Sequence, residues 1–496
     1  MTPPFDLRAF ADRAMRENGF LPEVPADVAA EVARISDDPA GSSGDGDARR
    51  VRDLRHLPWS SIDNDTSRDL DQLEVVDRAD DGNGGGGGVR VRVAIADVDT
   101  TVHQGSATDR FAAANATSVY TGAATYPMLP ERLSTDVTSL GQDASRASVV
   151  IEFVVGGDGA IRSHDVYLAL VENHAKLAYD DVGAWLEGHP GAALPPAVTP
   201  EIEAQLRLQD AVAQSLRAVR ARAGALDLET AEAHSVVRAD GSVDVEAVRK
   251  TRANALIEDF MIAANVAMAQ FLDERGSPSI RRVVRTPERW NRIVALAAAV
   301  GETLPPAPDS GALAAFLERR HAADPEHFPD LSLAVVKLLG PGEYALHHPG
   351  GAAGDDGHFG LAAPDYTHAT APNRRFADLV TQRLLKAVLA GRPVPYADDE
   401  LAGIARHCTE REDAARKVER TVRKAAAAVA MATHVGQTFG AIVTGVTPKG
   451  TFVRLLGPPV EGRVVRGEHG LDVGDKVRVT LLATDPARGY VDFGVG

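Results

Sequence analysis

Four aspartates fall within nine residues in the segment SIDNDTSRDLDQ, which spans residues 61–72. They are Asp63, Asp65, Asp69 and Asp71. Asp69 and Asp71 are two residues apart, so on an extended strand their carboxylates point to one face, and Asp63 can return over that face through a short loop. Carboxylates that converge in this way suit Mg²⁺, which binds oxygen ligands at about 2.1 Å in octahedral geometry. Two such ions about 4 Å apart can clamp the attacking and leaving oxygens of a phosphodiester.

The same spacing has two other interpretations. Read as a twelve-residue calcium loop, the segment places side-chain oxygens at positions one, three, five, seven, nine and twelve: Asp63, Asp65, Ser67, Asp69, Asp71 and Glu74. Position six holds Arg68, where such a loop needs glycine for its sharp turn, so the calcium interpretation is disfavoured. An acidic, solvated surface loop is the ordinary interpretation in a protein with a net charge of -17, and spacing alone does not separate it from a nuclease centre.

The bulk composition is that of a soluble globular protein with two or three domains. The chain has 496 residues, of which 44% are hydrophobic and 25% are charged, and this length buries a sizeable core. The acidic balance argues against indiscriminate binding to nucleic acid or anionic membrane, so basic residues for a polyanion must be gathered locally. The single cysteine, Cys408, suits a reducing compartment. Without a signal-peptide pattern or an apolar run long enough for a bilayer, we expect a cytoplasmic protein that enters no membrane.

Residues 1–48 predict a small helical module of helix-turn-helix type. Within 5–36 the pattern favours two short helices with apolar side chains that face one another: Phe10, Met15 and Phe20 against Val28, Val32 and Ile35. Such a pair is usually a packing unit, and nucleic-acid recognition is the less common role. A polar, glycine-rich stretch at 37–47 marks the end of the module.

The rest of the chain predicts a mixed α/β (α+β) protein. Strands at 73–76 and 89–97, with a glycine tract between them, indicate a hairpin. From about 200 to 430 the apolar spacing is helical, and after His434 five short strands fit a closed OB barrel. We therefore expect a helical module at 1–48, a catalytic domain at 49–431 and an OB barrel at 432–496.

Six further segments occur in a characteristic order: VAIAD (93–97), YPMLPERLS (126–134), AKLAYDDV (175–182), IEDFMIAANVAMAQFL (257–272), GHFGLA (357–362) and YTHATAPNRRFADLV (366–380). In this order the chain resembles the catalytic domain of the ribonuclease II / ribonuclease R family over roughly residues 50–430. Its last part resembles the S1-type OB fold that follows that domain. The resemblance implies a hydrolytic exoribonuclease that degrades single-stranded RNA from the 3′ end, uses Mg²⁺ and releases nucleoside 5′-monophosphates.

The resemblance also implies the catalytic and metal-binding residues. Asp63, Asp69 and Asp71 match the first three acidic positions of the family pattern, and Asp71 matches the aspartate on which activity depends most. Gln72 stands at the fourth position. Arg374, in APNRRF, matches the arginine at the scissile phosphate, where a planar guanidinium stabilises the charge of the transition state.

Three residues match positions along the RNA channel of the family. Tyr120 matches a tyrosine that stacks near the 3′-terminal bases, and stacking tolerates any base sequence. Core packing is the alternative for Tyr120. Glu258 and Glu419 match channel glutamates, and Glu258 alternatively faces solvent.

Basic and aromatic residues near the C-terminus predict the rest of the RNA-binding surface. Arg416, Arg420 and Arg423 recur at helical spacing and form a basic face for phosphates, with a salt-bridged solvated face as the alternative. Phe452 and Arg488 match nucleic-acid-facing positions of the S1-type pattern, with a purely structural barrel as the alternative.

Two departures from the family pattern qualify these expectations. Gln72 offers a neutral oxygen in place of a carboxylate, so either the second ion binds weakly or another carboxylate, Asp65 or Asp97, takes its place. A catalytically weakened RNA-binding regulator is the alternative function that follows.

Tandem cold-shock domains do not fit in the roughly 50 residues before the resembling region, and the helical module there is expected to contact nucleic acid or protein. We expect a monomer.

Overall fold

The computed structural model describes residues 5–36, 51–79, 87–196, 198–229, 250–325, 327–350, 357–448 and 450–495 of the chain. It also describes the backbone of two strands, at 232–237 and 243–248. The stretch at 37–47 that we expect to end the helical module lies outside these residues, as does most of the glycine tract, at 80–86.

A seven-stranded sheet in the order β1-β8-β7-β4-β3-β2-β9 forms the centre of the catalytic part. Its strands are β1 Arg52–Asp53, β2 Ser60–Asp63, β3 Gln72–Arg78, β4 Val89–Ala96, β7 Ser145–Val155, β8 Ile161–Glu172 and β9 Ala175–Ala178. The predicted hairpin is present as β3 and β4, which pair antiparallel along their length. β2 pairs parallel with β9 and β1 pairs parallel with β8, so the sheet is mixed.

Each face of the sheet carries its own hydrophobic core, because successive strand residues point to opposite faces. On β4, Val93 and Ile95 face the core under α4 (Tyr179–Leu186), α5 (Pro200–Arg222) and α6 (Arg252–Glu274). Ala94 and Ala96 face the other core, under α3 (Ala107–Asn115) and α10 (Phe376–Ala390). By length and composition α6 is the one described helix that is able to cross a membrane, but 78% of its most apolar window is buried inside the protein, as expected of a core helix.

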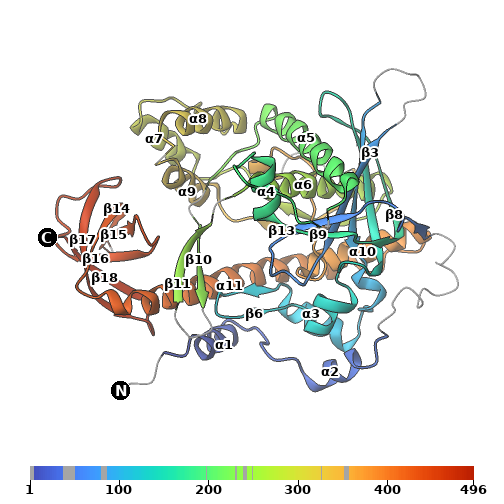
Figure 1. Ribbon diagram of the computed structural model, residues 1–496, viewed down its shortest axis with the longest axis horizontal. Helices are drawn as coiled ribbons and strands as arrows, with labels where there is room; N and C mark the ends of the chain where they lie inside the picture. The colour runs from blue at the N-terminus through green and yellow to red at the C-terminus, as the bar shows by residue number, and fades with distance from the viewer. Residues whose placement is uncertain are drawn as a thin grey trace.

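The 34-residue helix α11 (Asp398–Met431) connects the catalytic part to the barrel. At 1.5 Å per residue it is about 50 Å long, and Figure 1 shows it crossing the molecule with the barrel at its C-terminal end. The remaining elements are η3 Val98–Thr100, β5 Val119–Tyr120, β6 Thr125–Tyr126, η4 Leu133–Val137, β10 Glu232–Val237, β11 Val243–Val248, β12 Ser279–Val283, α7 Trp290–Ala299, α8 Ser310–Ala323, α9 Phe328–Leu339, β13 Glu343–His347, η5 Phe359–Leu361 and η6 Ala432–His434.

The C-terminal strands close into the predicted five-stranded barrel, in the order β14-β15-β16-β18-β17. The strands are β14 Thr438–Thr447, β15 Gly450–Leu455, β16 Glu461–Arg466, β17 Lys476–Asp485 and β18 Tyr490–Val495. The barrel core includes Val453, Leu481 and Phe493, together with Ala428 and Met431 at the end of α11. The predicted mixed α/β fold with a closed C-terminal barrel is confirmed.

The two N-terminal helices, α1 (Leu7–Glu17) and α2 (Ala26–Val32), do not face each other as the sequence suggested. Phe10, Met15 and Phe20 pack with Val418 and Val422 of α11. The other predicted set joins a different core: Val28 and Val32 pack with α3 and α10 residues, and Ile35 is partly buried against them. The expected mutual contact is wrong because each helix buries more apolar surface against the large domain than so short a partner provides.

Candidate active site

The Asp71 carboxylate and the Arg374 guanidinium meet at the centre of the predicted site. Arg374 Nε donates to Asp71 Oδ2 at 2.6 Å, and the backbone N–H of Asn373 donates to Asp71 Oδ1 at 3.1 Å. Asp71 is fully buried, whereas 35% of the Arg374 side chain is exposed. Burial raises the pKa of the Asp71 carboxyl to about 6, against the opposing charge of Arg374. Residues 303 positions apart in the chain are thus joined by a buried, charge-assisted bond.

The turn that holds Arg374 is fixed on several sides. Arg375 caps α10 and binds Asp378 through two bonds of 2.8 and 2.7 Å, and Asp378 also accepts from the Ala371 N–H at 2.8 Å. The Arg374 carbonyl accepts from the Ser118 N–H at 2.9 Å, just before β5. The guanidinium is therefore held by its backbone as well as by Asp71.

Asp69 and Asp71 do not lie on a strand, contrary to the expectation from spacing, because β3 begins only at Gln72. The backbone before it has few bonds to strands: the Asp71 carbonyl accepts from the Ala96 N–H of β4 at 2.9 Å, and side chains bind the residues that precede it. The Asp63 carboxylate accepts from the Asn64 N–H at 2.7 Å and from Ser67 Oγ at 2.9 Å, which starts a turn. Leu70 N–H then donates to a serine hydroxyl, Ser139 Oγ, at 3.1 Å.

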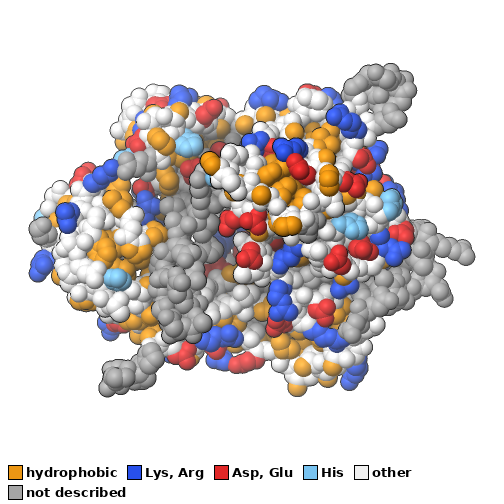
Figure 2. All heavy atoms as spheres, in the orientation of Figure 1, with side chains coloured by type: hydrophobic (Ala, Val, Ile, Leu, Met, Phe, Trp, Pro, Cys, Tyr) orange, Lys and Arg blue, Asp and Glu red, His pale blue; other side chains and the backbone are white. Residues whose placement is uncertain are grey.

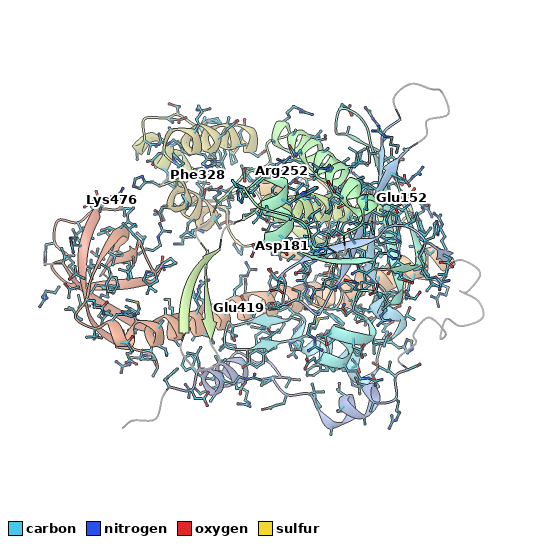
Figure 3. The ribbon with its side chains drawn as sticks, viewed as in Figure 1. Glu152, Asp181, Arg252, Phe328, Glu419 and Lys476 are labelled. Atoms are coloured by element: carbon cyan, nitrogen blue, oxygen red, sulfur yellow. The ribbon has the colours of Figure 1, made fainter. Side chains whose placement is uncertain are left out.

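Asp69 and Glu419 both contact Tyr120, which lies on β5. The Tyr120 hydroxyl donates to Asp69 Oδ2 at 3.5 Å, a long bond, and the Tyr120 N–H donates to Glu419 Oε1 at 3.0 Å. Figure 3 shows Glu419 on α11. The Tyr120 side chain is 45% exposed, so the alternative of simple core packing is wrong. Asp69, Tyr120 and Glu419 thus form one connected group beside Asp71.

The two carboxylates suggested as substitutes for Gln72 have different surroundings, and their role stays a prediction. Asp97 is bound by Lys386 Nζ at 2.6 Å and also accepts from the Thr100 N–H. Asp65 is exposed on the loop after β2. A different acid, Glu74 on β3, is fully buried, and neither of its carboxylate oxygens has a hydrogen-bond partner in the described part of the chain. Burial, and then the Asp63 carboxylate, raise the pKa of Glu74 well above its ordinary value.

The donor set of this region fits a hard divalent cation. Its acids offer only oxygen ligands, as Mg²⁺ prefers, and both carboxyl oxygens of the nearby Glu74 are buried without a hydrogen-bond partner among the described residues. Within the described residues no three Asp, Glu, His or Cys side chains lie close enough together to hold an ion by themselves. In Figure 2 acidic side chains gather near the centre of the visible face, beside a hollow and close to Asp181 of α4, which Figure 3 labels.

The calcium-loop interpretation is wrong. The segment lies between two strands, β2 and β3, and not between helices, and its position-twelve residue, Glu74, is buried within β3. A solvated surface loop is also contradicted, because Asp63 and Asp71 are buried.

Glu258 and the Arg416 side chain make their ion pairs away from the bond between Asp71 and Arg374. Glu258 is exposed on α6 and pairs with Lys250. Arg416 pairs with Glu412 at 3.1 Å and with Asp413 at 3.5 Å, so in this structure its charge is engaged by acids of the same helix. Arg420 is exposed, as the phosphate-binding interpretation requires.

The barrel residues Phe452 and Arg488 lie apart from one another in the fold. Phe452 is a partly exposed residue of β15 that alternates with buried Val453. Arg488 is exposed in the turn between β17 and β18, 3.8 Å from Asp485. The next residue, Gly489, has φ +66° and approaches α11 so closely that a Cβ there would lie 2.8 Å from Lys424 Cβ. Arg488 is therefore held beside the C-terminal part of α11.

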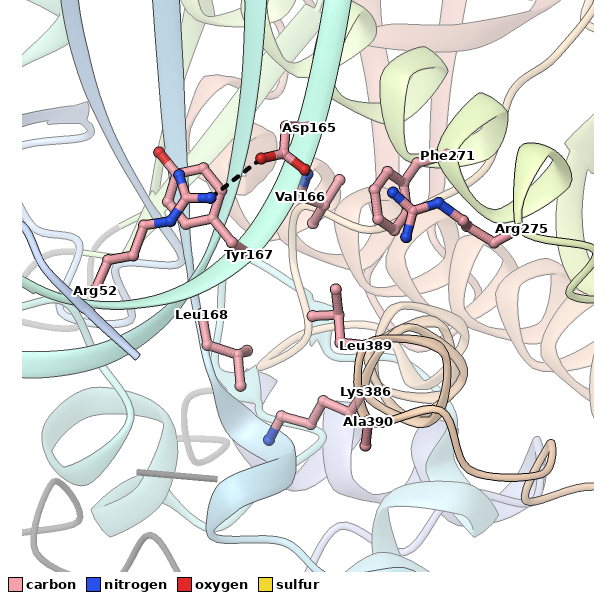
Figure 4. Close-up of a pocket in the computed structure, with 10 residues that line it drawn as sticks. All are labelled: Arg52, Asp165, Val166, Tyr167, Leu168, Phe271, Arg275, Lys386, Leu389 and Ala390. Atoms are coloured by element: carbon pink, nitrogen blue, oxygen red, sulfur yellow. Dashed lines mark hydrogen bonds and ion pairs between the residues drawn. The ribbon is translucent and has the colours of Figure 1, made fainter. Parts of the chain in front are cut away.

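A separate cavity of about 220 Å³ lies between β8, the C-terminal end of α6 and the C-terminal end of α10. Figure 4 shows Arg52 over the Tyr167 ring and Arg275 over the Phe271 ring at its wall. None of the predicted site residues lines it, so it is not part of the candidate active site.

Models of known families match nearly the whole described catalytic part and the barrel. An RNB domain matches residues 51–391, and the C-terminal S1 domain of RNase II-type exonucleases matches residues 437–496. The chain belongs to the RNB family. The resemblance drawn from the ordered motifs is thereby confirmed.

Relatives of this RNB protein include ribonucleases R from several bacteria. It is 29% identical to Ribonuclease R of Thermotoga maritima over 512 residues, covering 95% of this chain and 68% of that protein. It is 31% identical to Ribonuclease R of Vibrio cholerae over 523 residues, covering 97% and 60%. The chain spans 55% to 69% of the length of these and similar relatives.

Solved structures share the fold of this RNB protein. Mycoplasma genitalium RNase R in complex with ribose methylated single-stranded RNA matches with a TM-score of 0.85 at 22% identity, covering 99% of this chain and 78% of that one. Yeast Ssd1, a pseudonuclease, matches with a TM-score of 0.70 at 18% identity, covering 96% and 57%.

Sequence reasoning about the site did not find Glu74 or the anchoring role of Asn373. Glu74 entered only as a calcium-loop position, although its place two residues after Gln72 puts both side chains on one face of the strand. Asn373 immediately precedes Arg374 in the APNRRF motif, and its Oδ1 accepts from Thr138 Oγ1 at 2.6 Å.

Proposed function

We propose that this RNB protein is a hydrolytic 3′-to-5′ exoribonuclease that degrades single-stranded RNA to nucleoside 5′-monophosphates with Mg²⁺ as its cofactor. The observation that carries the proposal is the buried bond between Asp71 and Arg374, which joins the acidic cluster to the arginine of the APNRRF motif. Ribonucleases R among its relatives, one of them solved with single-stranded RNA, support the same activity.

The contacts support a proposed role for each of the central residues. Arg374 donates a hydrogen bond from Nε to Asp71. The remaining N–H donors of its planar guanidinium are proposed to stabilise charge on the scissile phosphate. Asp71 orients that fork. Tyr120 offers its half-exposed ring to the terminal bases, and Glu419 fixes the Tyr120 backbone.

Asp63, Asp69 and Asp71, with the neutral oxygen of Gln72, are the residues proposed to hold Mg²⁺. A bound divalent cation supplies Lewis-acid activation of the phosphate and of the attacking water. We further propose that the 2′-hydroxyl and backbone shape distinguish RNA from DNA.

Arg416, Arg420, Phe452 and Arg488 are proposed to bind RNA outside the catalytic centre. Glu258 is proposed as a channel residue, with Lys250 as the counter-charge that RNA binding must displace. Four expectations stay predictions. They are the domain boundaries at residues 48 and 431, the monomeric state, the cytoplasmic location and an N-terminal contact with nucleic acid or protein.

A second candidate is an RNA-binding regulator with little hydrolysis, and Gln72 favours it. A structure with the same fold, that of yeast Ssd1, is described as a pseudonuclease. The intact Asp71–Arg374 pair supports the enzyme instead, because a site that has lost its chemistry does not need a buried ion pair that costs desolvation energy.

The test is the fate of a 5′-labelled single-stranded RNA incubated with the protein in Mg²⁺ or in EDTA, beside Asp71→Asn. We expect Mg²⁺-dependent shortening to a small labelled product, and 5′-monophosphates from uniformly labelled RNA, with neither in the variant. An intact RNA that is nevertheless bound by the wild-type protein would establish the regulator.

A further inference from the structure

A short buried segment contacts both halves of the proposed site. It consists of Thr138, Ser139 and Leu140, which follow η4 and are at most 5% exposed. We call these three residues the connecting segment. They bond to the loop that carries the aspartates and also to the turn that carries Arg374. A single segment that contacts both halves is able to fix the distance between them.

Ser139 holds the backbone on both sides of Asp69. Its hydroxyl accepts from the Leu70 N–H at 3.1 Å and donates to the Arg68 carbonyl oxygen at 2.7 Å, which uses its one hydrogen and one of its lone pairs. The bond from the Asp69 carboxylate to the Tyr120 hydroxyl is long, at 3.5 Å. The place of the Asp69 carboxylate therefore depends on the backbone that Ser139 holds.

Thr138 acts on the other half of the site, through Asn373. Its Oγ1 donates to Asn373 Oδ1 at 2.6 Å, and Asn373 has 0% exposure. The Asn373 backbone N–H in turn donates to Asp71 Oδ1 at 3.1 Å. Since Asn373 directly precedes Arg374, fixing it also fixes the backbone from which the guanidinium extends.

The connecting segment is itself held by bonds outside the site. The Thr138 N–H donates to the Leu133 carbonyl oxygen at 3.0 Å, which ends the π-helical turn η4, and such turns are frequent at functional sites. The Leu140 carbonyl oxygen accepts from Asn173 Nδ2, just after β8, at 3.0 Å. The two hydroxyls thus extend from backbone whose position does not depend on their own bonds to the site.

We propose that Thr138 and Ser139 are positioning residues for RNA cleavage. Ser139 sets the place of Asp69, and Thr138 sets the place of the Asp71–Arg374 pair, so that the two halves stand at the separation that the reaction requires. Both act through neighbouring groups and not by contact with the scissile phosphate. The inference rests on the proposed function, because it adds positioning residues to the proposed nuclease.

The test is single-turnover cleavage of 5′-labelled single-stranded RNA by the full chain in Mg²⁺ at saturating RNA. Ser139→Ala and Thr138→Val remove a hydroxyl with little change of shape. Each is expected to slow cleavage roughly 10- to 100-fold, the loss typical of misplaced groups, with RNA affinity within about twofold of the wild type. Thr138→Ser keeps the hydroxyl and is expected to retain most of the rate.

Thr135→Val is the matched control and should leave rate and affinity unchanged. It removes a hydroxyl on η4 that bonds to the Glu131 carbonyl oxygen at 2.8 Å, away from both halves of the site. Cleavage within about twofold of the wild type in Ser139→Ala or Thr138→Val would overturn the role of that residue. Equal losses in Thr138→Ser and Thr138→Val would also overturn the role of Thr138, because the hydroxyl would then not matter.

Amide hydrogen exchange measures the same bonds without RNA. Ser139→Ala is expected to speed exchange of the Leu70 N–H, which loses its acceptor, whereas Thr135→Val is not. Unchanged exchange in Ser139→Ala would overturn the inference. If that variant does not fold, the wild-type protein decides, since a Leu70 N–H that exchanges as fast as an exposed loop amide contradicts its bond to Ser139.

The two measurements separate this inference from the proposed function. Hydrolysis by the wild type and by Ser139→Ala at the same rate would reject the inference and leave the exoribonuclease in place. No hydrolysis by the wild type, with faster Leu70 exchange in Ser139→Ala, would reject the exoribonuclease and leave the positioning of the acidic loop in place.

Discussion

The Asp71–Arg374 centre and the C-terminal barrel hold their proposed RNA-contacting residues in different ways. In the centre, Asp71, Arg374, Asp69, Tyr120 and Glu419 are linked by hydrogen bonds across distant parts of the chain. On the barrel, by contrast, Phe452 and Arg488 project from separate elements toward solvent.

This difference indicates how the two regions contribute. Residues fixed by buried bonds are preorganised for a transition state, where misplacement of about 1 Å costs rate. Exposed aromatic and basic residues contribute to affinity, tolerate RNA of any sequence and respond to salt. Variants should therefore separate the rate of cleavage from the strength of binding.

After Asp71→Asn, the largest effect is expected from Arg374→Lys. Lysine keeps the charge but has neither the Nε donor that binds Asp71 nor the planar fork, so cleavage under saturating RNA should fall roughly 10²- to 10³-fold. Single-turnover kinetics with labelled RNA measure this loss. A variant that cleaves within about twofold of the wild type would contradict the assigned role of Arg374.

The barrel variant Phe452→Ala with Arg488→Ala should show the opposite behaviour. Loss of one stacking ring and one phosphate contact is expected to weaken RNA affinity about tenfold, while the single-turnover rate at saturating RNA stays unchanged. Fluorescence anisotropy with labelled RNA gives the affinity. An unchanged affinity would make the barrel structural.

Acid should destabilise the catalytic part through His358. Burial, and then the charge of Arg282, lower the pKa of His358 to about 4 from 6.5. A lowered histidine pKa means that its contribution to stability is complete above about pH 6.5 and is lost as the pH falls toward 4. The three tryptophans, Trp59, Trp185 and Trp290, all lie outside the barrel, so their fluorescence reports this unfolding.

Urea midpoints followed by that fluorescence between pH 7 and 4 should fall more steeply for the wild type than for His358→Gln. Parallel pH profiles of the two proteins would show that His358 is not a source of the acid sensitivity.

The smallest effect is expected on the basic face of α11. Arg420→Ala should reduce the slope of log affinity against log salt by about 0.7, the value for one phosphate contact of a single strand. Arg416→Ala is the matched control and should change the slope less, because Arg416 is engaged by Glu412 and Asp413. Equal changes in both variants would mean that RNA displaces those acids.

Much of the fold could be predicted because local patterns determine it. Alternation of apolar residues predicted β3 and β4, and regular turns between short apolar runs predicted the five barrel strands. The ordered motifs assigned Asp71 and Arg374 to one catalytic site, and the structure places them in contact although they lie 303 residues apart in the chain.

The remaining features depend on tertiary contacts that no local pattern encodes. The turn from Asp63 to Leu70 is set by side-chain bonds to Ser67 and Ser139, so the strand expected under Asp69 starts later. Likewise, α1 buries Phe10 and Met15 on α11, a helix nearly 400 residues away. Glu74 could be recognised as unpartnered only once Ser60 and α5 were placed around it.

The most direct test of the account measures cleavage rate and RNA affinity together, for Asp71→Asn and for the barrel double variant Phe452→Ala with Arg488→Ala. We predict that Asp71→Asn loses cleavage by roughly 10³-fold or more while its RNA affinity stays within about threefold of the wild type. The barrel variant should cleave saturating RNA at the wild-type rate and bind RNA more weakly. Cleavage by Asp71→Asn at the wild-type rate would contradict the account, because the buried Asp71–Arg374 pair would then not be the centre of the chemistry.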